Sequence, residues 1–518
     1  MRQTELLCAG GRSVALAGAI LALAGCAAGC SGRAASTESE SAPNQQAGVL
    51  ANRDWWDAFY MGDARVGYTH TTTRTTMWHG RPAIELAVEN RLVLERFGQK
   101  TTQEVTTTAH ETPAGQLLDL RNETRVAQAP IVLTAKVVGS ELRVETTASG
   151  QARQTAIPWS TDIGGLMAVE RSLLEKPLRP GEKRSVRLVM PMLDQVVLAT
   201  NHLEAGDYET TEMPSGPVEL LRVTSRVELP GGGITSTIWL NRQGETLKTR
   251  IDALGMQSFR TTKEVALGKP EAASFDLGYD TVVRLARPLE NPRAGRLARY
   301  RVTLKQGDPA AVFPHGPTQE VHAEDAHTAL LTVRAVRPGE PVKASADAAP
   351  TAADREPNSL IQSDNARVTE LAREAVGDET DPVKVAIALE RFVHERIRKK
   401  NFSQALATAA EVAKNLEGDC TEHAVLLAAL ARAKGIPARV AIGLVYIPSE
   451  QGFGYHMWNE LYLDGAWIPM DATIGRGGIG ADHLKLAQSN LQAAGALTCF
   501  LPVAKVMGQL GIELIESE

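Results

Sequence analysis

One cysteine, Cys420, stands where a helix is predicted to begin, and a thiol at such a position can act as a nucleophile. Asp419 is a residue type that caps helices, and Glu422 completes a capping-box pattern. The apolar run that follows ends at Gly435, with Pro437 just beyond, which is a normal helix stop. The thiol would face the positive end of the helix dipole, which favours the thiolate that attacks acyl carbons.

A nucleophilic cysteine needs a base, and the base needs an orienting group. Two runs typical of strands flank Asp464-Gly465, a dipeptide that favours a two-residue hairpin. In that register Asp471 is the diagonal neighbour of His456 on the same face, at about 7–8 Å between backbones. A carboxylate there can hold the imidazole in the useful tautomer. Pro469 requires a position outside the ladder, such as an edge strand.

Some residues near Cys420 have more than one interpretation. Cys420 itself could be an inert buried cysteine. His423, one turn later, could be the base, although a position beside the helix cap is favoured. Cys420 and His423 could also bind zinc, but the sequence has no second Cys/His pair at the spacing that a structural zinc site needs. Trp458 shares the predicted face of His456 and would wall the cleft or pack in the core. The predicted catalytic residues are Cys420, His456 and Asp471, with Asp419, Glu422, His423 and Trp458 around them. No metal or cofactor is predicted.

The region from about Ser359 to Thr473 resembles the transglutaminase-like domain of the papain-like cysteine enzymes. The similarity lies in Gly418-Asp419-Cys420, in the separations to His456 and Asp471, and in segments 431–439 and 467–473. The resemblance implies an α+β domain with helices packed on an antiparallel sheet. It also implies a mechanism, in which the Cys420 thiolate forms a thioester with an amide carbonyl, His456 transfers protons and Asp471 orients His456. Water or an amine would then resolve the thioester.

The 518-residue chain is long enough for two to four domains. Short alternating runs between turn signals predict a β-rich antiparallel domain at 51–285, an open barrel or a sandwich, with one helix near 163–175. A small β module at 286–336 and a linker at 337–358, rich in Pro, Ala, Asp and Glu, are predicted next. The catalytic domain would span 359–495, with helices at 366–376 and 383–399. Residues 496–518 are predicted to form a C-terminal tail strand.

The N-terminus has the pattern of an export signal. Arg2 and Arg12 precede a short apolar run that ends in Leu23-Ala24-Gly25-Cys26. This resembles a bacterial lipobox, so residues 1–25 are predicted to be a signal peptide, Cys26 to be lipidated and 26–50 to be a flexible tether. A plain secretory signal is the alternative. Lipidation would place the protein in the bacterial cell envelope, facing the periplasm or the exterior.

The composition narrows the function further. Hydrophobic residues make up 43%, charged residues 22%, and the net charge is −6, which fits a globular protein and gives no reason to expect a nucleic-acid partner. The five cysteines do not form a disulfide framework. The favoured function is a cysteine amidohydrolase or peptidase with a protein, peptide or wall-peptide substrate, held at the membrane by its lipid. A glutamine transamidase is the alternative enzyme, and a binding lipoprotein whose β-rich region carries the function is the alternative of another class.

Overall fold

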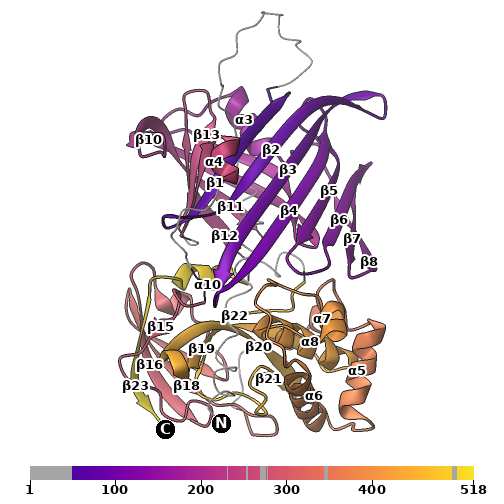
Figure 1. Cartoon of the computed structure of the whole chain (residues 1–518), viewed down its shortest axis with the longest axis vertical. Helices are drawn as coiled ribbons and strands as arrows, with labels where there is room; N and C mark the ends of the chain where they lie inside the picture. The colour runs from indigo at the N-terminus through magenta and orange to yellow at the C-terminus, as the bar shows by residue number, and fades with distance from the viewer. Residues whose placement is uncertain are drawn as a thin grey trace, which may run out of the picture.

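A computed structural model of the chain describes residues 49–229, 232–252, 255–268, 276, 278–342, 348–492 and 499–518. The predicted signal peptide, Cys26, most of the tether and part of the linker lie outside these residues. The described residues form antiparallel sheets with few helices, which confirms the prediction in that respect. Figure 1 shows the largest sheet above two smaller ones. No helix in the described ranges is long and apolar enough to cross a membrane.

Among the described residues, fourteen strands make one continuous antiparallel sheet. The chain runs back and forth through β1 to β8 on one side and β9 to β14 on the other, and β1 pairs with β14 to join the halves. The strands are β1 (Arg53–Met61), β2 (Ala64–Trp78), β3 (Arg81–Arg96), β4 (Gln99–Glu111), β5 (Leu117–Arg125), β6 (Ile131–Val138), β7 (Glu141–Ala148), β8 (Gln151–Pro158), β9 (Lys183–Met192), β10 (Gln195–Thr211), β11 (Val218–Leu229), β12 (Gly232–Leu240), β13 (Thr246–Ile251) and β14 (Met256–Thr261).

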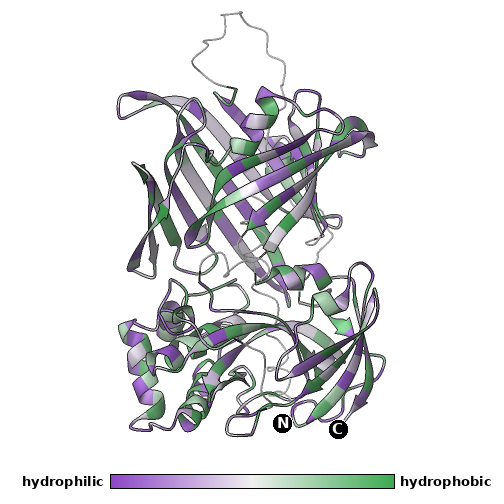
Figure 2. Ribbon diagram, turned by 180° about the vertical axis from the view of Figure 1, so that it is seen from behind, coloured by the Kyte–Doolittle hydropathy of each residue, from purple (hydrophilic) through white to green (hydrophobic). Residues whose placement is uncertain are grey.

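Alternation of buried and exposed side chains explains why this region forms strands. Hydrophobic and hydrophilic bands alternate along the ribbons in Figure 2, as expected when one face of each strand packs inward. The buried face also carries hydroxyls, since Thr69 and Thr107 are buried and hydrogen-bond Asn90 and Asn122 on neighbouring strands. Helix α3 (Ala168–Glu175) interrupts the strands between β8 and β9, within the range predicted for a helix.

The second sheet carries the predicted site. Its order is β15-β20-β19-β22, and β21 pairs only with β20 at the edge. Helix α8 contacts β19, β20 and the three helices before it. Every residue of β19 is buried, which fits a strand that is covered on both faces. The elements are β15 (Val283–Arg284), α5 (Ala366–Val376), α6 (Pro382–Arg396), α7 (Ala409–Asn415), α8 (Cys420–Ala433), β19 (Ala438–Ile447), β20 (Gly452–Leu463), β21 (Ala466–Met470) and β22 (His483–Ser489).

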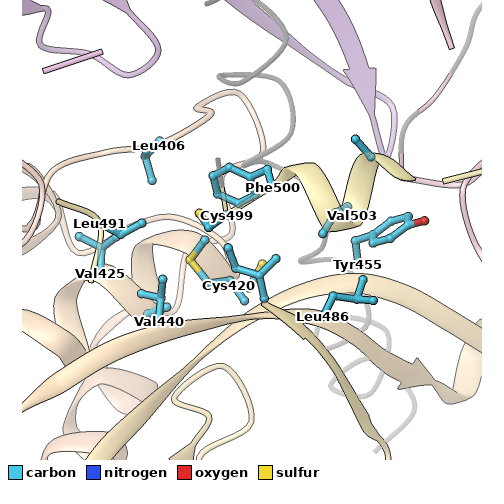
Figure 3. Close-up of a cluster of buried hydrophobic side chains, with 14 of the residues drawn as sticks. Leu406, Cys420, Val425, Val440, Tyr455, Leu486, Leu491, Cys499, Phe500 and Val503 are labelled. Carbon is cyan, nitrogen blue, oxygen red and sulfur yellow. The ribbon is translucent and has the colours of Figure 1, made fainter. Parts of the chain in front are cut away.

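The C-terminal segment returns to an earlier part of the chain. After α10 (Leu501–Val506), strand β23 (Leu510–Ser517) pairs with β16 (Leu297–Leu304). The third sheet therefore has the order β17-β18-β16-β23, with β17 at Gln319–Asp325 and β18 at Thr328–Arg334. This return places α10 above the second sheet, next to the predicted site (Figures 1 and 3).

A buried ion pair ties the large sheet to the nucleophile helix. Arg96, at the end of β3, donates from Nη2 to Asp419 Oδ2 at 2.6 Å, and both side chains are fully buried. Its Nη1 also donates to the carbonyls of Phe402 and Gln404, each at 3.1 Å. Thr101 of β4 donates to the Phe402 carbonyl as well, at 2.6 Å. The β3–β4 end of the large sheet thus contacts both the cap of α8 and the loop before α7.

We predict strong coupling between Arg96 and Asp419 because neither charge has access to water. Arg96→Met, Asp419→Asn and the double variant, unfolded in urea, should give a coupling energy of about 1–3 kcal/mol. Asparagine at position 419 preserves the helix cap, so this double-mutant cycle measures the energy of the ion pair alone. As a control, Arg96→Met combined with Asp57→Asn should be additive within about 0.5 kcal/mol. Additivity in the Arg96–Asp419 cycle would contradict this account of how the sheets are joined.

Candidate active site

The structure starts α8 at Cys420, as the cap pattern predicted. Asp419 Oδ1 accepts from the Thr421 N–H at 2.9 Å, and Glu422 Oε2 accepts from the Asp419 N–H at 2.9 Å, so the capping box is present. Gly418 precedes the cap with a φ of +146°, and a Cβ there would lie 2.4 Å from the Glu422 side chain. Only glycine lets the chain turn this tightly into the helix. The cysteine is therefore held at the first turn by a rigid local structure.

The predicted hairpin register is confirmed. Leu463 pairs with Ala466 across Asp464 and Gly465, both of which have positive φ. The ladder ends at Met470, and Asp471 follows, where its Oδ2 accepts from His456 Nε2 at 2.8 Å. Pro469 lies in β21, which is an edge strand of this sheet, as its missing N–H required.

The Cys420 thiol lies against β20 beside His456. The N–H of Met457, the residue after His456, donates a hydrogen bond to the thiol. The Asn459 side chain donates to the Ala424 carbonyl of α8 at 2.8 Å, which fixes the helix on the strand. The structure thus brings the three predicted catalytic residues into one buried region, and each is at most 2% exposed.

Burial reverses the expected effect on the thiol. It raises the pKa of Cys420, and the nearby Asp419 carboxylate raises it further, while the Met457 N–H and Arg96 lower it. A helix dipole stabilises an anion by up to about 2 kcal/mol, or roughly 1.5 pKa units, whereas full burial shifts a pKa by up to about 3–5 units. The neutral thiol is therefore the form held in this closed structure, and the predicted thiolate requires access to solvent or substrate.

The Asp471 carboxylate remains charged in the same environment. Its burial opposes ionisation, but the charge and hydrogen bond of His456, with further contributions from His483, hold the pKa of Asp471 well below its usual range. His483 Nε2 donates to the same Asp471 oxygen at 3.2 Å. The orienting carboxylate thus has two histidine partners.

Apolar side chains cover the thiol. Figure 3 shows Leu406, Cys499 and Phe500 above Cys420, in one buried hydrophobic cluster. Phe500 is only 1% exposed. The loop that contains Leu406 is fixed to α8, because Glu422 Oε1 accepts from the Ala407 N–H at 3.1 Å. A substrate must displace this cover to reach the sulfur.

The remaining predicted neighbours, His423 and Trp458, are also buried. His423 Nδ1 donates to the Asp419 carbonyl within its own helix, and burial lowers the pKa of His423 to about 3. It is thus a neutral group beside the cap. The Trp458 ring stacks with His456 at 6.1 Å between centroids and meets His483 edge-on at 5.2 Å. It walls one side of the histidine cluster.

Two further residues that support Asp471 were not predicted. Glu390 of α6 accepts from the backbone N–H groups of Asp471 and Gly478, at 2.9 and 3.3 Å, and burial raises its pKa to about 7. A glutamate on the buried stripe of an amphipathic helix is a signal that could have identified it. His483 gave no comparable signal, because its place depends on the pairing of β22 with β19.

The only group of potential metal ligands that converges among the described residues is His456, Asp471 and His483, within 4.8 Å of one another. The two contacts to Asp471, 2.8 and 3.2 Å, have hydrogen-bond lengths. The other nitrogen of His483, Nδ1, donates to Asp482 Oδ1 at 2.8 Å. We therefore interpret the group as a hydrogen-bond network rather than a set of metal ligands.

Residues 369–472 match the family model described as the transglutaminase-like superfamily. This segment includes Cys420, His456 and Asp471, and the match confirms the resemblance that their spacing suggested. A search of curated proteins found no match.

Solved structures show weaker likenesses. A candidate cysteine protease from Cytophaga hutchinsonii is 15% identical over 44% of this chain and 85% of its own, with a TM-score of 0.26. A beta-barrel-like protein of the DUF1849 family from Brucella abortus is 11% identical over 41% and 95%, with a TM-score of 0.31. The periplasmic domain of TgpA from Pseudomonas aeruginosa is 17% identical over 35% and 91%, with a TM-score of 0.23. Since these scores are below 0.5, the family match alone identifies the domain.

We predict that Phe500 limits access to Cys420. Phe500→Ala should raise the rate of Cys420 alkylation by iodoacetamide at least about tenfold at pH 8, because it opens the cover and lets the thiol ionise. Mass spectrometry of digested protein would follow the modification.

Phe313→Ala is the matched control. Phe313 is equally buried, at 1% exposed, and its N–H bonds the turn at Pro309–Ala311, which contacts β16, β17 and β18 of the third sheet. Its truncation should therefore cost similar stability, about 3–5 kcal/mol, without changing Cys420 alkylation. Equal acceleration in both variants would mean that global unfolding, rather than the cover, controls the thiol.

Proposed function

We propose that this chain is a cysteine amidohydrolase or peptidase, tethered to the bacterial cell envelope, that cleaves amide bonds through a thioester on Cys420. The observation that carries the proposal is the buried His456–Asp471 contact beside a thiol at the first turn of α8. This arrangement supplies a nucleophile, a base and an orienting carboxylate, which together form the unit that acyl transfer needs.

The proposed reaction has two halves. In the first, the Cys420 proton passes to His456, the sulfur attacks the amide carbonyl carbon, and the C–N bond breaks as His456 gives the proton to the leaving amine. A thioester remains on Cys420. In the second, His456 takes a proton from water, the hydroxyl adds to the carbonyl carbon, and the C–S bond breaks to release a carboxylic acid and regenerate the thiol.

The orientation of His456 is consistent with this sequence. Its Nε2 donates a hydrogen bond to Asp471, so Nδ1 is the nitrogen that would exchange a proton with the thiol. The N–H of Cys420 belongs to the first turn of α8, where backbone donors lack intrahelical acceptors, and it would stabilise the oxyanion. Displacement of the cover by substrate would expose the sulfur and remove the main cause of its raised pKa.

Transamidation is the second candidate, and the apolar cover favours it in one respect. Leu406 and Phe500 exclude water from the thiol in the closed structure. If the cover closes over the thioester, an amine that enters with its own binding energy would compete well with water. Protein or wall-peptide amides are the proposed acyl donors for both candidates.

We predict that activity depends on the three residues as a unit. With a casein-like substrate and a tagged amine, Cys420→Ala and His456→Ala should each lower turnover by about 10³-fold or more, and Asp471→Asn by about 10²–10⁴-fold. New peptide termini would identify hydrolysis, whereas covalent incorporation of the tag would identify transamidation.

Cys499→Ala is the cysteine control. It removes the other buried thiol, and because Cys499 lies in the cover and not in the catalytic unit, the variant should retain or gain activity. Thermal unfolding would verify that each variant folds. A Cys420→Ala variant as active as Cys499→Ala would exclude the proposed nucleophile. That result would favour the alternative of a binding lipoprotein, in which the large sheet carries the function.

The envelope tether rests on the N-terminal sequence, outside the described residues. We predict that Cys26→Ser, expressed in a bacterial host, abolishes lipidation and releases the signal-cleaved protein from the membrane fraction, because the lipid would anchor it there. Fractionation and mass spectrometry of the mature N-terminus would measure this. Cys30→Ser serves as the control, because it changes the other cysteine near the same signal. Membrane retention of a Cys26→Ser protein from which the signal has been removed would rule out anchoring through this residue.

A further inference from the structure

His483 lies between two buried carboxylates. Its Nε2 is 3.2 Å from Asp471 Oδ2, and its Nδ1 is 2.8 Å from Asp482 Oδ1. The other Asp482 oxygen, Oδ2, accepts from Arg293. His483, Asp471 and Asp482, which we call the His483 network, are almost fully buried, at no more than 2% exposure.

The contacts of His483 require both ring nitrogens to donate. A neutral imidazole carries one N–H and one lone pair, so one of its nitrogens would face a carboxylate oxygen without a proton between them. An imidazolium satisfies both contacts. It also balances the charge, since two cations, His483 and Arg293, then meet two anions, Asp471 and Asp482.

We propose that His483 is a positioning residue of the active site, a buried imidazolium that fixes the Asp471 carboxylate and tunes the protonation of His456 through it. This inference rests on the proposed function. His483 touches neither the thiol nor any expected substrate atom, and it acts only through Asp471.

The pKa of His483 agrees with its geometry. Burial opposes its charge, but the Asp482 carboxylate and the hydrogen bonds to both aspartates raise the pKa above its ordinary value. The other charged or titratable groups on the surrounding elements include His456 of β20, Glu390 of α6, His423 of α8, Tyr300 of β16, Tyr446 of β19, Arg293, and the buried group of Glu460 with Lys485 and Arg439.

The proposal fixes the sign of the effect on His456. The ring centroids of His483 and His456 are 6.0 Å apart, so a cation at His483 opposes a second cation at His456. The His483 cation also offsets part of the negative charge of Asp471, the charge that stabilises a protonated His456. Loss of the His483 charge should therefore raise the pKa of His456 by about two units at an effective dielectric constant of roughly 20.

The test uses the full chain and two variants, His483→Gln and Asp482→Asn. The first removes the imidazole, and the second keeps it but removes the carboxylate that holds its second proton. ¹⁵N NMR of histidine-labelled protein should show both nitrogens of His483 protonated at pH 7.5 in the native chain. In both variants the His456 titration should move up by about two pH units.

The pH profile of kcat/KM provides a second readout. The limb that reports deprotonation of His456 should move to higher pH in both variants, and the double variant should shift no further than either single variant. A purely structural role would lower activity at every pH and leave the limbs in place.

The outcomes separate this proposal from the proposed function. A neutral His483 at pH 7.5, or an unmoved His456 titration in a folded Asp482→Asn protein, would overturn the positioning role even if the enzyme is active. A shifted His456 titration in a chain with no amide-cleaving or transamidating activity would support the His483 network and overturn the proposed function. Asp482→Asn keeps the size of the side chain, so it remains informative if His483→Gln does not fold.

Discussion

Burial of charge is the constraint on which this site depends. Asp419, Asp471 and Asp482 lie in a region almost without solvent, where an unpaired carboxylate costs several kcal/mol. Different partners stabilise them. Arg96 binds Asp419 from the large sheet, histidines bind Asp471, and Arg293 binds Asp482. The pairing explains why strands far apart in sequence converge at the start of α8.

The same burial has two opposing effects on the chemistry of the thiol. A cysteine at a helix start should ionise readily, but the apolar cover raises its pKa and keeps it neutral. A dry site in turn strengthens every hydrogen bond inside it, which suits acyl transfer once substrate is bound. We infer that the closed structure is a resting form and that opening of the segment around Phe500 precedes chemistry.

Local sequence predicted the site well where local rules decide the structure. Asp419 and Glu422 formed the expected capping box, and Asp464-Gly465 set the hairpin register that brings Asp471 to His456. The antiparallel character of the N-terminal region also followed from alternation and turn residues. In each of these cases the relevant residues lie within about twenty positions of one another, so propensity and turn geometry suffice.

Residues that reach the site through long-range pairing could not be predicted in this way. Arg96 meets Asp419 only because the β3–β4 end of the large sheet lies against the second sheet. His483 depends on β22 joining β19, and Phe500 on the return of the C-terminus to β16. The burial that raises the pKa of the Cys420 thiol could not be predicted for the same reason. The cover comes from a segment that no local pattern connects with Cys420.

The central claim is that Cys420 carries a thioester. Acid-quenched samples of the chain mixed with an amide substrate, measured by intact-mass and peptide mass spectrometry, test it most directly. The account predicts an acyl adduct on the peptide that contains Cys420, sensitive to hydroxylamine and absent from His456→Ala. Turnover of the amide with no adduct on Cys420, or with an adduct on another residue, would contradict it.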